Sequence, residues 1–102
     1  MKLLLITILL SLQISGSQAA TQFGDEDCKS IADLAHVIMV GRQGGIAMTK
    51  MIDGFTREPN ARVIIIDAYK LPRVHSHSLR KTVTEDFRDK WALACYTQDA
   101  SD

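Results

Sequence analysis

The chain has 102 residues, of which 12 are lysine or arginine and 12 are aspartate or glutamate, so its formal net charge is zero at pH 7. This balance leaves no basic excess to attract nucleic acid or anionic lipid, and it argues against both as partners. The charges are mixed along the chain, without the long like-charge block that is typical of a disordered tail.

The first 19 residues have the pattern of a secretory signal peptide. A basic start at Lys2 is followed by the apolar run "LLLITILLSLQI" and by small residues, with a predicted cleavage site after Ala19 or, nearly as well, after Ala20. The alternative, a membrane anchor, needs about 20 apolar residues, more than this run supplies. We therefore expect a soluble periplasmic or secreted protein of one domain, residues 20–102, with an ordered core of about 27–96. With Lys2 removed, eleven basic residues face twelve acidic ones, and the net charge becomes −1.

The first predicted helix starts at Cys28, after a loose segment 20–26. Apolar residues recur there at helical spacing, within an arc of about 120°, and they are Cys28, Ile31, Ala32, Ala35, Ile38 and Met39. Asp25 or Asp27 is expected to cap this helix, because a carboxylate accepts the unpaired N–H groups of the first turn. The sequence "GRQGG", residues 41–45, is expected to end it, since glycine is favoured just past a helix.

Two shorter helices are predicted in the middle of the chain. The first covers 46–55, ends near Gly54 and is expected to face inward through Ile46, Met51, Ile52 and Phe55. The segment 61–71 is ambiguous, because its run of β-branched residues favours a strand. We expect a buried helix instead, since no second strand is predicted to pair with it.

The last predicted helix follows the loop "RVHSHS", residues 73–78, and is capped by Ser76 or Ser78. Its apolar stripe, which we expect to complete the core, consists of Leu79, Val83, Phe87, Trp91, Ala94 and Cys95. The final residues, 96–102, are expected to form a frayed tail. Together these segments predict an all-α protein, a small bundle of about four helices.

Cys28 and Cys95 are the two cysteines of the chain. Exported proteins meet oxidants, and a single pair has one possible connectivity, so we predict a disulfide between the first and last helices. A metal site needs more ligands at closer spacing, and a catalytic thiol would leave the other cysteine unpaired. Antiparallel packing would bring the first turn of the first helix beside the last turn of the last helix. Because the core of such a small domain is thin, this cross-link is expected to matter for folding.

Candidate binding residues gather at the glycine turn, and they are Arg42, Gln43, Gly44, Gly45 and Met48. If the first helix extends to Arg42, its guanidinium group lies inside the apolar arc and is suited to bind a carboxylate. That carboxylate belongs either to another protein or to an internal residue, for instance Asp67 or Asp86, and a solvated Arg42 is the third possibility. Residues 43–45 form either an anion-binding nest or, more simply, a plain turn. The nearby methionines either fill gaps in the core or form an adaptable surface.

The sequence contains no specific catalytic or metal-binding motif. His75 and His77 are two residues apart, no third ligand has a fixed spacing to them, and His36 is distant on the first helix. No nucleophile motif is present, and the aromatic residues Tyr69, Phe87 and Trp91 are interpreted as part of the core. We therefore predict a protein that is not an enzyme and that needs no metal or cofactor.

The motifs "C…A…IMVGRQGG…M", "AYKLP" and "F…W…AC" resemble those of a group of small exported two-cysteine helical proteins of proteobacteria and their prophages. The resemblance covers residues 28–95 and rests on Cys28, Arg42, Gln43, Gly45, Met51, Ala68, Tyr69, Pro72, Phe87 and Cys95. It implies a helix in 61–71 and brings no established activity. In architecture alone, the chain is also similar to periplasmic chaperones of the Hde type and to periplasmic immunity proteins.

The leading hypothesis is an exported, non-enzymatic protein-binding module, of the immunity or inhibitor type. Its expected partner is another protein, and its expected state is a monomer or a weak homodimer. One alternative is a periplasmic chaperone that responds to acid or stress. Another is a small hydrolytic or metal-dependent enzyme that uses His75 and His77.

Overall fold

The computed structural model describes residues 24–101, with side chains up to Gln98. Within this part of the chain there are four helices and no strand, and the helices are α2 (Asp25–Gln43), α3 (Met48–Gly54), α4 (Ala61–Tyr69) and α5 (His77–Ser101). The predicted all-α fold is therefore confirmed. The predicted signal peptide, with its cleavage site after Ala19 or Ala20, lies outside the described residues.

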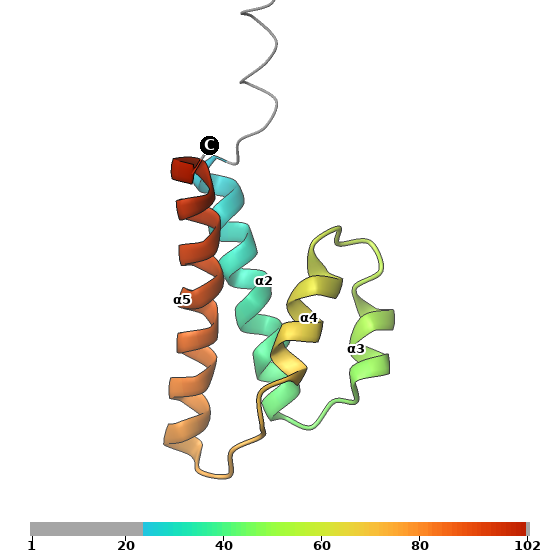
Figure 1. The fold of residues 1–102 in the computed structure, drawn as a ribbon. Coiled ribbons are helices and arrows are strands. Elements are labelled where there is room, and N and C mark those ends of the chain that lie inside the picture. The colour runs from blue at the N-terminus through green and yellow to red at the C-terminus, as the bar shows by residue number, and fades with distance from the viewer. Residues whose placement is uncertain (1–23, 102) are drawn as a thin grey trace, which may run out of the picture.

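The two long helices, α2 and α5, run antiparallel and lie side by side along most of their length (Figure 1). Helix α4 packs mainly on α2, and the short α3 packs on α4 and on α2. The last helix leads back past the start of the first, so the described ends of the chain lie together at one end of the molecule. Helix α2 is therefore the element against which all the others are arranged.

The core forms where α2, α4 and α5 meet, with one residue added from α3. Its buried members are Ala35, Ile38, Met39, Met51, Ala61, Ile64, Ile65, Ala68 and Phe87. The predicted apolar stripe of α2 is confirmed, because its residues recur at helical spacing and face both α4 and α5. The prediction of a helix in the β-branched segment is also confirmed, although Val63 is 60% exposed and this helix is not buried all round.

The disulfide between Cys28 and Cys95 joins the first turn of α2 to α5, with the two Cα atoms 5.5 Å apart. The predicted cross-link between the first and last helices is thus confirmed. Its predicted place in the last turn of the last helix is wrong, because α5 continues to Ser101. The predicted frayed tail from residue 96 is wrong for the same reason. The helices within residues 24–101 are each too short or too polar to be a candidate membrane span.

The helix starts differ in part from the sequence predictions. Helix α2 begins at Asp25, before Cys28, and its N-cap is Gly24 rather than Asp25 or Asp27. The carboxylate of Asp27 reaches back from the third helical position and accepts the N–H of Gly24 at 3.3 Å. At α5 the prediction is confirmed for Ser76, whose hydroxyl accepts the N–H of Leu79 at 3.1 Å.

Three side chains that were expected in the core are exposed. Ile46 precedes α3, which begins only at Met48, and it lies in the turn rather than on an inward helix face. Leu79 belongs to a turn of α5 that extends past the end of α2, given that the disulfide fixes the register of the two antiparallel helices. Ala94 lines an open pocket beside Val63, because the short α4 does not cover this part of α5.

Candidate functional site

The glycine turn is the C-terminal cap of α2. The helix runs through Arg42 and ends at Gln43, so the predicted extension to Arg42 is confirmed. The next three backbone N–H groups, of residues 44–46, donate to the carbonyls of residues 40, 42 and 41 at 2.9, 3.1 and 3.0 Å. Gly45 has φ 93, a left-handed conformation that glycine adopts without strain. The turn is therefore a plain helix-ending turn, and these three N–H groups are not free to bind an anion.

Gly41 has a different role, since it allows α3 to approach α2 closely. A Cβ atom at this position would overlap the Cε atom of Met51 and lie 3.3 Å from Cδ1 of Ile46. Met39 and Met51 are buried, so these two methionines fill the core. Met48, by contrast, is 37% exposed at the start of α3.

Arg42 binds the backbone of the connection between α4 and α5. Its Nε and Nη2 atoms donate to the carbonyl oxygen of Leu71 at 3.0 and 2.9 Å, and its guanidinium carbon lies 4.8 Å from the centre of the Tyr69 ring. The expected internal carboxylates are not its partners among the described residues. Asp67 accepts hydrogen bonds from α5 instead, and Asp86 lies on the rim of a separate cleft. The partner of Arg42 is thus a carbonyl group rather than a carboxylate.

Gln43 is 2% exposed. Its side-chain amide forms hydrogen bonds to the backbone of the connection between α4 and α5, in the way that a peptide group does in a sheet. Nε2 donates to the carbonyl of Pro72 at 3.0 Å, and Oε1 accepts the N–H of Val74 at 2.8 Å. In return, Nε of Arg73 donates to the backbone carbonyl of Gln43 at 3.3 Å. This buried polar side chain therefore has partners for both of its functional atoms.

Arg80 of α5 holds the other end of the connection. Its Nε donates to the carbonyl of Val74 at 3.1 Å, and its Nη2 donates to the carbonyl of His75 at 3.2 Å. We call the three side chains of Arg42, Gln43 and Arg80, together with the backbone of residues 71–75, the clasp. The clasp supplies hydrogen-bond partners to a segment that belongs to no helix and therefore has no regular ladder of its own.

Tyr69 adds a contact from the end of α4 to the glycine turn. Its hydroxyl donates a hydrogen bond to the carbonyl of Ile46. Burial raises the pKa of Tyr69 above the usual value of a tyrosine, and the positive charge of Arg42 partly opposes that rise. The neutral hydroxyl is thus favoured in the folded protein.

An apolar cleft of about 310 Å³ lies between the clasp and α5. Its lining residues are Leu71, Pro72, Val74, Val83, Asp86, Phe87 and Lys90. Phe87 is 2% exposed and forms part of the core, whereas Leu71 is 37% exposed at the edge of the cleft. We call this the apolar cleft.

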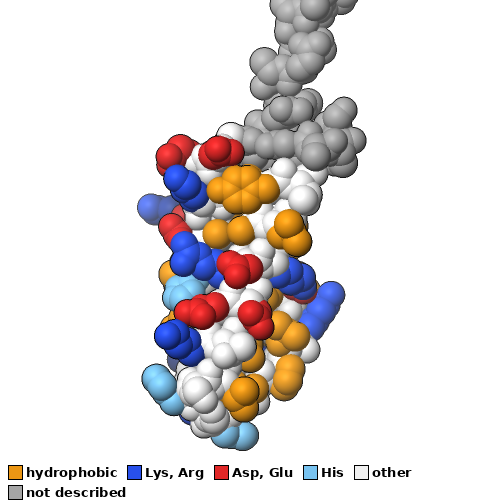
Figure 2. Space-filling model, turned by 90° about the vertical axis from the view of Figure 1, so that its left-hand side faces the viewer, with side chains coloured by type: hydrophobic (Ala, Val, Ile, Leu, Met, Phe, Trp, Pro, Cys, Tyr) orange, Lys and Arg blue, Asp and Glu red, His pale blue; other side chains and the backbone are white. Residues whose placement is uncertain are grey.

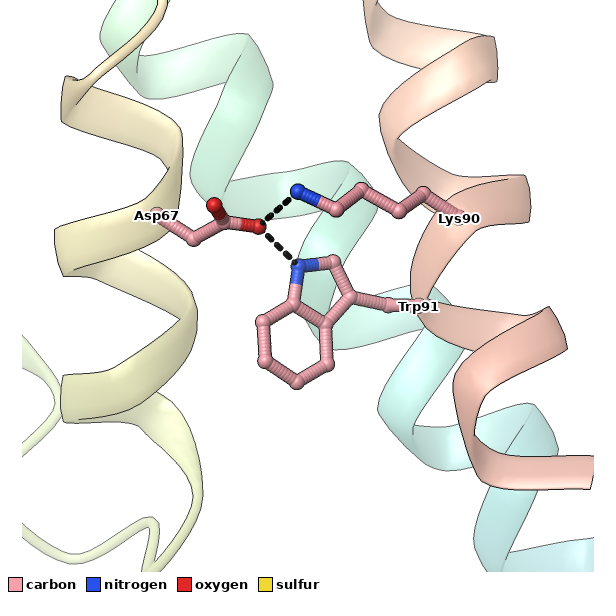
Figure 3. Close-up of polar contacts among 3 residues, drawn as sticks. All are labelled: Asp67, Lys90 and Trp91. Carbon is pink, nitrogen blue, oxygen red and sulfur yellow. Dashed lines mark hydrogen bonds and ion pairs between the residues drawn. The ribbon is translucent and has the colours of Figure 1, made fainter. Parts of the chain in front are cut away.

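A polar contact joins Asp67 of α4 to Lys90 and Trp91 of α5 (Figure 3). Lys90 also lines the apolar cleft. One carboxylate oxygen of Asp67, Oδ2, accepts hydrogen bonds from Lys90 Nζ at 2.6 Å and from Trp91 Nε1 at 2.9 Å. The cleft is therefore bounded by the clasp on one side and by this contact on another.

A second cleft, of about 380 Å³, lies between α2 and the first turns of α5. Its lining residues are His36, Val40, Gln43, Gly44, His77, Arg80, Lys81 and Thr84. Figure 2 views the molecule from the α5 side and shows histidine side chains in the lower half of this face, with basic and acidic side chains above and beside them. We call this the basic cleft. In the described part of the chain, no three His, Cys, Asp or Glu side chains come together as metal ligands would.

The structure divides the predicted binding residues into two groups. Arg42 and Gln43 belong to the clasp, while Gly44 and Gly45 in the turn and Met48 at the start of α3 are exposed. Gln43 and Gly44 also line the basic cleft, so the predicted turn borders one of the two clefts. The sequence prediction missed Leu71 and Val74, although these two apolar residues of the loop "LPRV" were a signal for them. Val83 was assigned to the core, and it is half-buried against the core as well as lining the apolar cleft.

No protein-family model, no curated protein and no solved structure matches this chain. The class of the protein is therefore defined by its own geometry, a disulfide-linked helical domain in which α5 borders the apolar cleft and the basic cleft.

Proposed function

We propose that this chain is an exported, non-enzymatic protein-binding module, and that its apolar cleft receives an apolar side chain of a partner protein. The observation that carries the proposal is the apolar cleft itself, which is open, lined mainly by apolar side chains and held by polar contacts at its edges. Pockets that bind a partner are typically concave and apolar with a few polar groups at fixed places.

The fixed edges favour binding because they reduce the ordering that association requires. Immobilising a flexible side chain on binding costs about 0.5–1.5 kcal/mol, and a site that is already rigid avoids much of this cost. Leu71, Pro72 and Val74 are held in place by the clasp before any partner arrives. Burying one large apolar side chain of the partner then contributes about 1.5–3 kcal/mol.

The residues of the apolar cleft have the composition that is usual for a binding surface. Asp86 and Lys90 give the apolar centre a polar rim, which is the usual arrangement in protein interfaces. Lys90 already has Asp67 as its partner, so a ligand need not neutralise this charge. A small rigid domain of this kind suits an inhibitor or an immunity protein, which acts by occupying a surface of its target.

The proposed location is the periplasm or the outside of the cell. The Cys28–Cys95 disulfide supports it, because disulfides form and persist in oxidising compartments. The signal-peptide pattern of the first 19 residues supports it independently.

Site-specific photocrosslinking in the producing cells tests the proposal. A photoreactive amino acid replaces Val83 in the apolar cleft, and a control variant carries it at Asp89, which is exposed on the same helix. We expect one crosslinked protein from position 83 and none from position 89. That protein, once purified, should bind the wild-type chain at least about tenfold more tightly than Val83→Asp, a change of about 1.4 kcal/mol.

Equal crosslinking from both positions, or none from position 83, would argue against the apolar cleft as a binding site. Because Val83 is half-buried, the thermal stability of Val83→Asp must be measured alongside its affinity. If this variant is destabilised, Leu71→Asp provides a second test at a more exposed position of the same cleft.

A further inference from the structure

We propose that the basic cleft binds the carboxylate side chains of an acidic segment of the partner protein. This inference rests on the proposed function, since it specifies the chemistry of the partner at a second place beside α5. The basic cleft lies on the α2 side of this helix, whereas the apolar cleft lies on the side of the clasped connection.

All the ionisable side chains that line the basic cleft are basic. They are His36 from α2 and His77, Arg80 and Lys81 from the first turns of α5. The lining residues include no aspartate or glutamate in the part of the chain that the structure describes. A concave site lined by one sign of charge focuses its field and attracts the opposite charge.

Two carboxylates lie near the cleft, both at the end away from the glycine turn. Asp33, one turn before His36 on α2, pairs with Arg88 at 2.8 Å and is thus neutralised. Glu85 is exposed, one turn beyond Lys81 on α5. Arg73 lies beyond the other edge, where its Nε is bound to the carbonyl of Gln43. The surroundings therefore remain basic on the side of the glycine turn.

Several donors of the cleft are free to meet a ligand. Arg80 uses Nε and Nη2 in the clasp, which leaves Nη1. Lys81 is exposed and has no ion pair among the described residues. His36 has a buried Nδ1 without a hydrogen-bond partner, so its Nε2 is the nitrogen that a ligand can reach. An ionised carboxylate, which only accepts hydrogen bonds, matches this set of donors.

The walls of the cleft favour a polypeptide over a small free anion. Between the basic groups lie Val40, which is 50% exposed, and the backbone of Gly44. A free phosphate would leave this apolar surface in water, whereas an acidic peptide can place an aliphatic neighbour of its carboxylate on it. The cleft thus fits a segment in which glutamate or aspartate alternates with apolar residues.

A binding experiment with a defined peptide tests this inference on the disulfide-bonded protein. The probe is an acetylated and amidated peptide of leucine and glutamate, titrated while NMR signals of residues 36, 77, 81 and 84 are followed. We expect saturable shifts that weaken as the salt concentration rises. Lys81→Gln should weaken binding by about two- to fivefold, as removing one exposed charge partner does, and Lys50→Gln on α3 should leave it unchanged.

Three other results would overturn the inference. One is binding of inorganic phosphate alone at the same residues, which would indicate a site for small anions. Another is equal binding of a leucine and glutamine peptide, which would remove the role of charge. The third is an equal effect of Lys81→Gln and Lys50→Gln. Each of these leaves crosslinking from Val83 unaffected, so a failure of this inference is distinguishable from a failure of the proposed function.

Discussion

The side-chain oxygen of Gln43 accepts the backbone N–H of Val74 at 2.8 Å, although the two residues are 31 positions apart in the chain. The amide nitrogen of the same side chain donates to Pro72. A single glutamine thus fixes both the end of α2 and the path of the chain into α5. The stability of the connection should depend on it strongly.

Replacing Gln43 with alanine should lower the free energy of unfolding by about 2–4 kcal/mol. The substitution leaves two backbone groups without their partner, each of which costs about 1–3 kcal/mol if buried, and it opens a cavity beside Met39. Urea denaturation measures the change. Thr49→Ala, at an exposed position of α3, serves as the control and should stay within about 0.5 kcal/mol of the wild type. An equally small effect of Gln43→Ala would show that the clasp does not contribute to stability.

Replacing Arg42 with alanine should lower the free energy of unfolding by about 2 kcal/mol. The expected loss lies between that for a solvated arginine and that for a buried ion pair, because the partner of Arg42 is the carbonyl of Leu71. Hydrogen bonds to charged groups contribute about 1.5–3 kcal/mol. Arg42→Lys should restore only part of the loss, since an ammonium group lacks the planar fork that reaches Leu71 with two nitrogens. Thermal unfolding of the three proteins provides the comparison. A change below about 0.5 kcal/mol in Arg42→Ala would instead leave Arg42 available as a partner contact.

Removing the disulfide by the double substitution Cys28→Ala and Cys95→Ala should lower the stability by about 4 kcal/mol. The bridge joins residues 67 positions apart, and closing a loop of that length restricts the unfolded chain by about this amount in the loop-entropy model. Denaturation of the wild-type protein with and without reductant should give a matching difference. Full stability of the reduced protein would mean that helix packing alone holds α2 and α5 together.

Two glycines should respond in opposite directions to alanine. Gly45→Ala should destabilise the protein by about 1–2 kcal/mol, because φ 93 strains any residue with a Cβ and the guanidinium of Arg73 lies 3.2 Å from the added atom. Gly54→Ala should be neutral or stabilising by up to about 1 kcal/mol, since this helical position has open space and a right-handed backbone. The melting temperatures of the two variants, each compared with that of the wild type, test this prediction. Equal melting temperatures would contradict the left-handed cap.

Tyr69 should make the stability fall at alkaline pH. Its pKa is raised in the folded state, chiefly by burial, so the folded protein holds this proton more tightly than the unfolded chain does. The contribution is present in full below the pKa of an unfolded tyrosine, about 10, and is lost as the pH rises through the folded value. The Tyr96→Phe variant leaves Tyr69 as the single tyrosine, and its absorbance reports the titration directly. Tyr69→Phe should remove this part of the pH dependence, and a midpoint at or below the unfolded value would contradict it.

The parts of the fold that could be predicted depend on patterns among residues that are close together in the sequence. The period of apolar residues in α2 predicts the buried face that the structure shows, because both the helix and its burial are set within a few turns. The pairing of Cys28 and Cys95 followed from their number and from the exported context rather than from geometry. Leu79 was wrongly expected in the core. Whether its turn of α5 packs on α2 depends on the register of the two helices, and the spacing of apolar residues does not contain that register.

The contacts of Arg42 and Gln43 in the clasp were beyond prediction, because their partners lie 29 to 31 residues away and are backbone atoms. The sequence marked Arg42 and Gln43 as unusual, since polar residues follow an apolar arc there. The structure gives these residues an internal role in the connection. Whether Gly44, Gly45 and Met48 also contact a partner stays a prediction. The apolar cleft is lined by that connection, and the basic cleft by two helices that are distant in the sequence, so both were out of reach of local patterns.

The Cys28–Cys95 bridge spans nearly all of the described chain, from the first turn of α2 to the later turns of α5. A protease that cuts once between these residues therefore yields two pieces that stay covalently attached to each other. The exposed loop between α3 and α4 is an accessible place for such a cut. A nicked molecule would keep both long helices at an effective concentration set by the bridge, and it should reassemble after mild denaturation without needing to find its other half in solution.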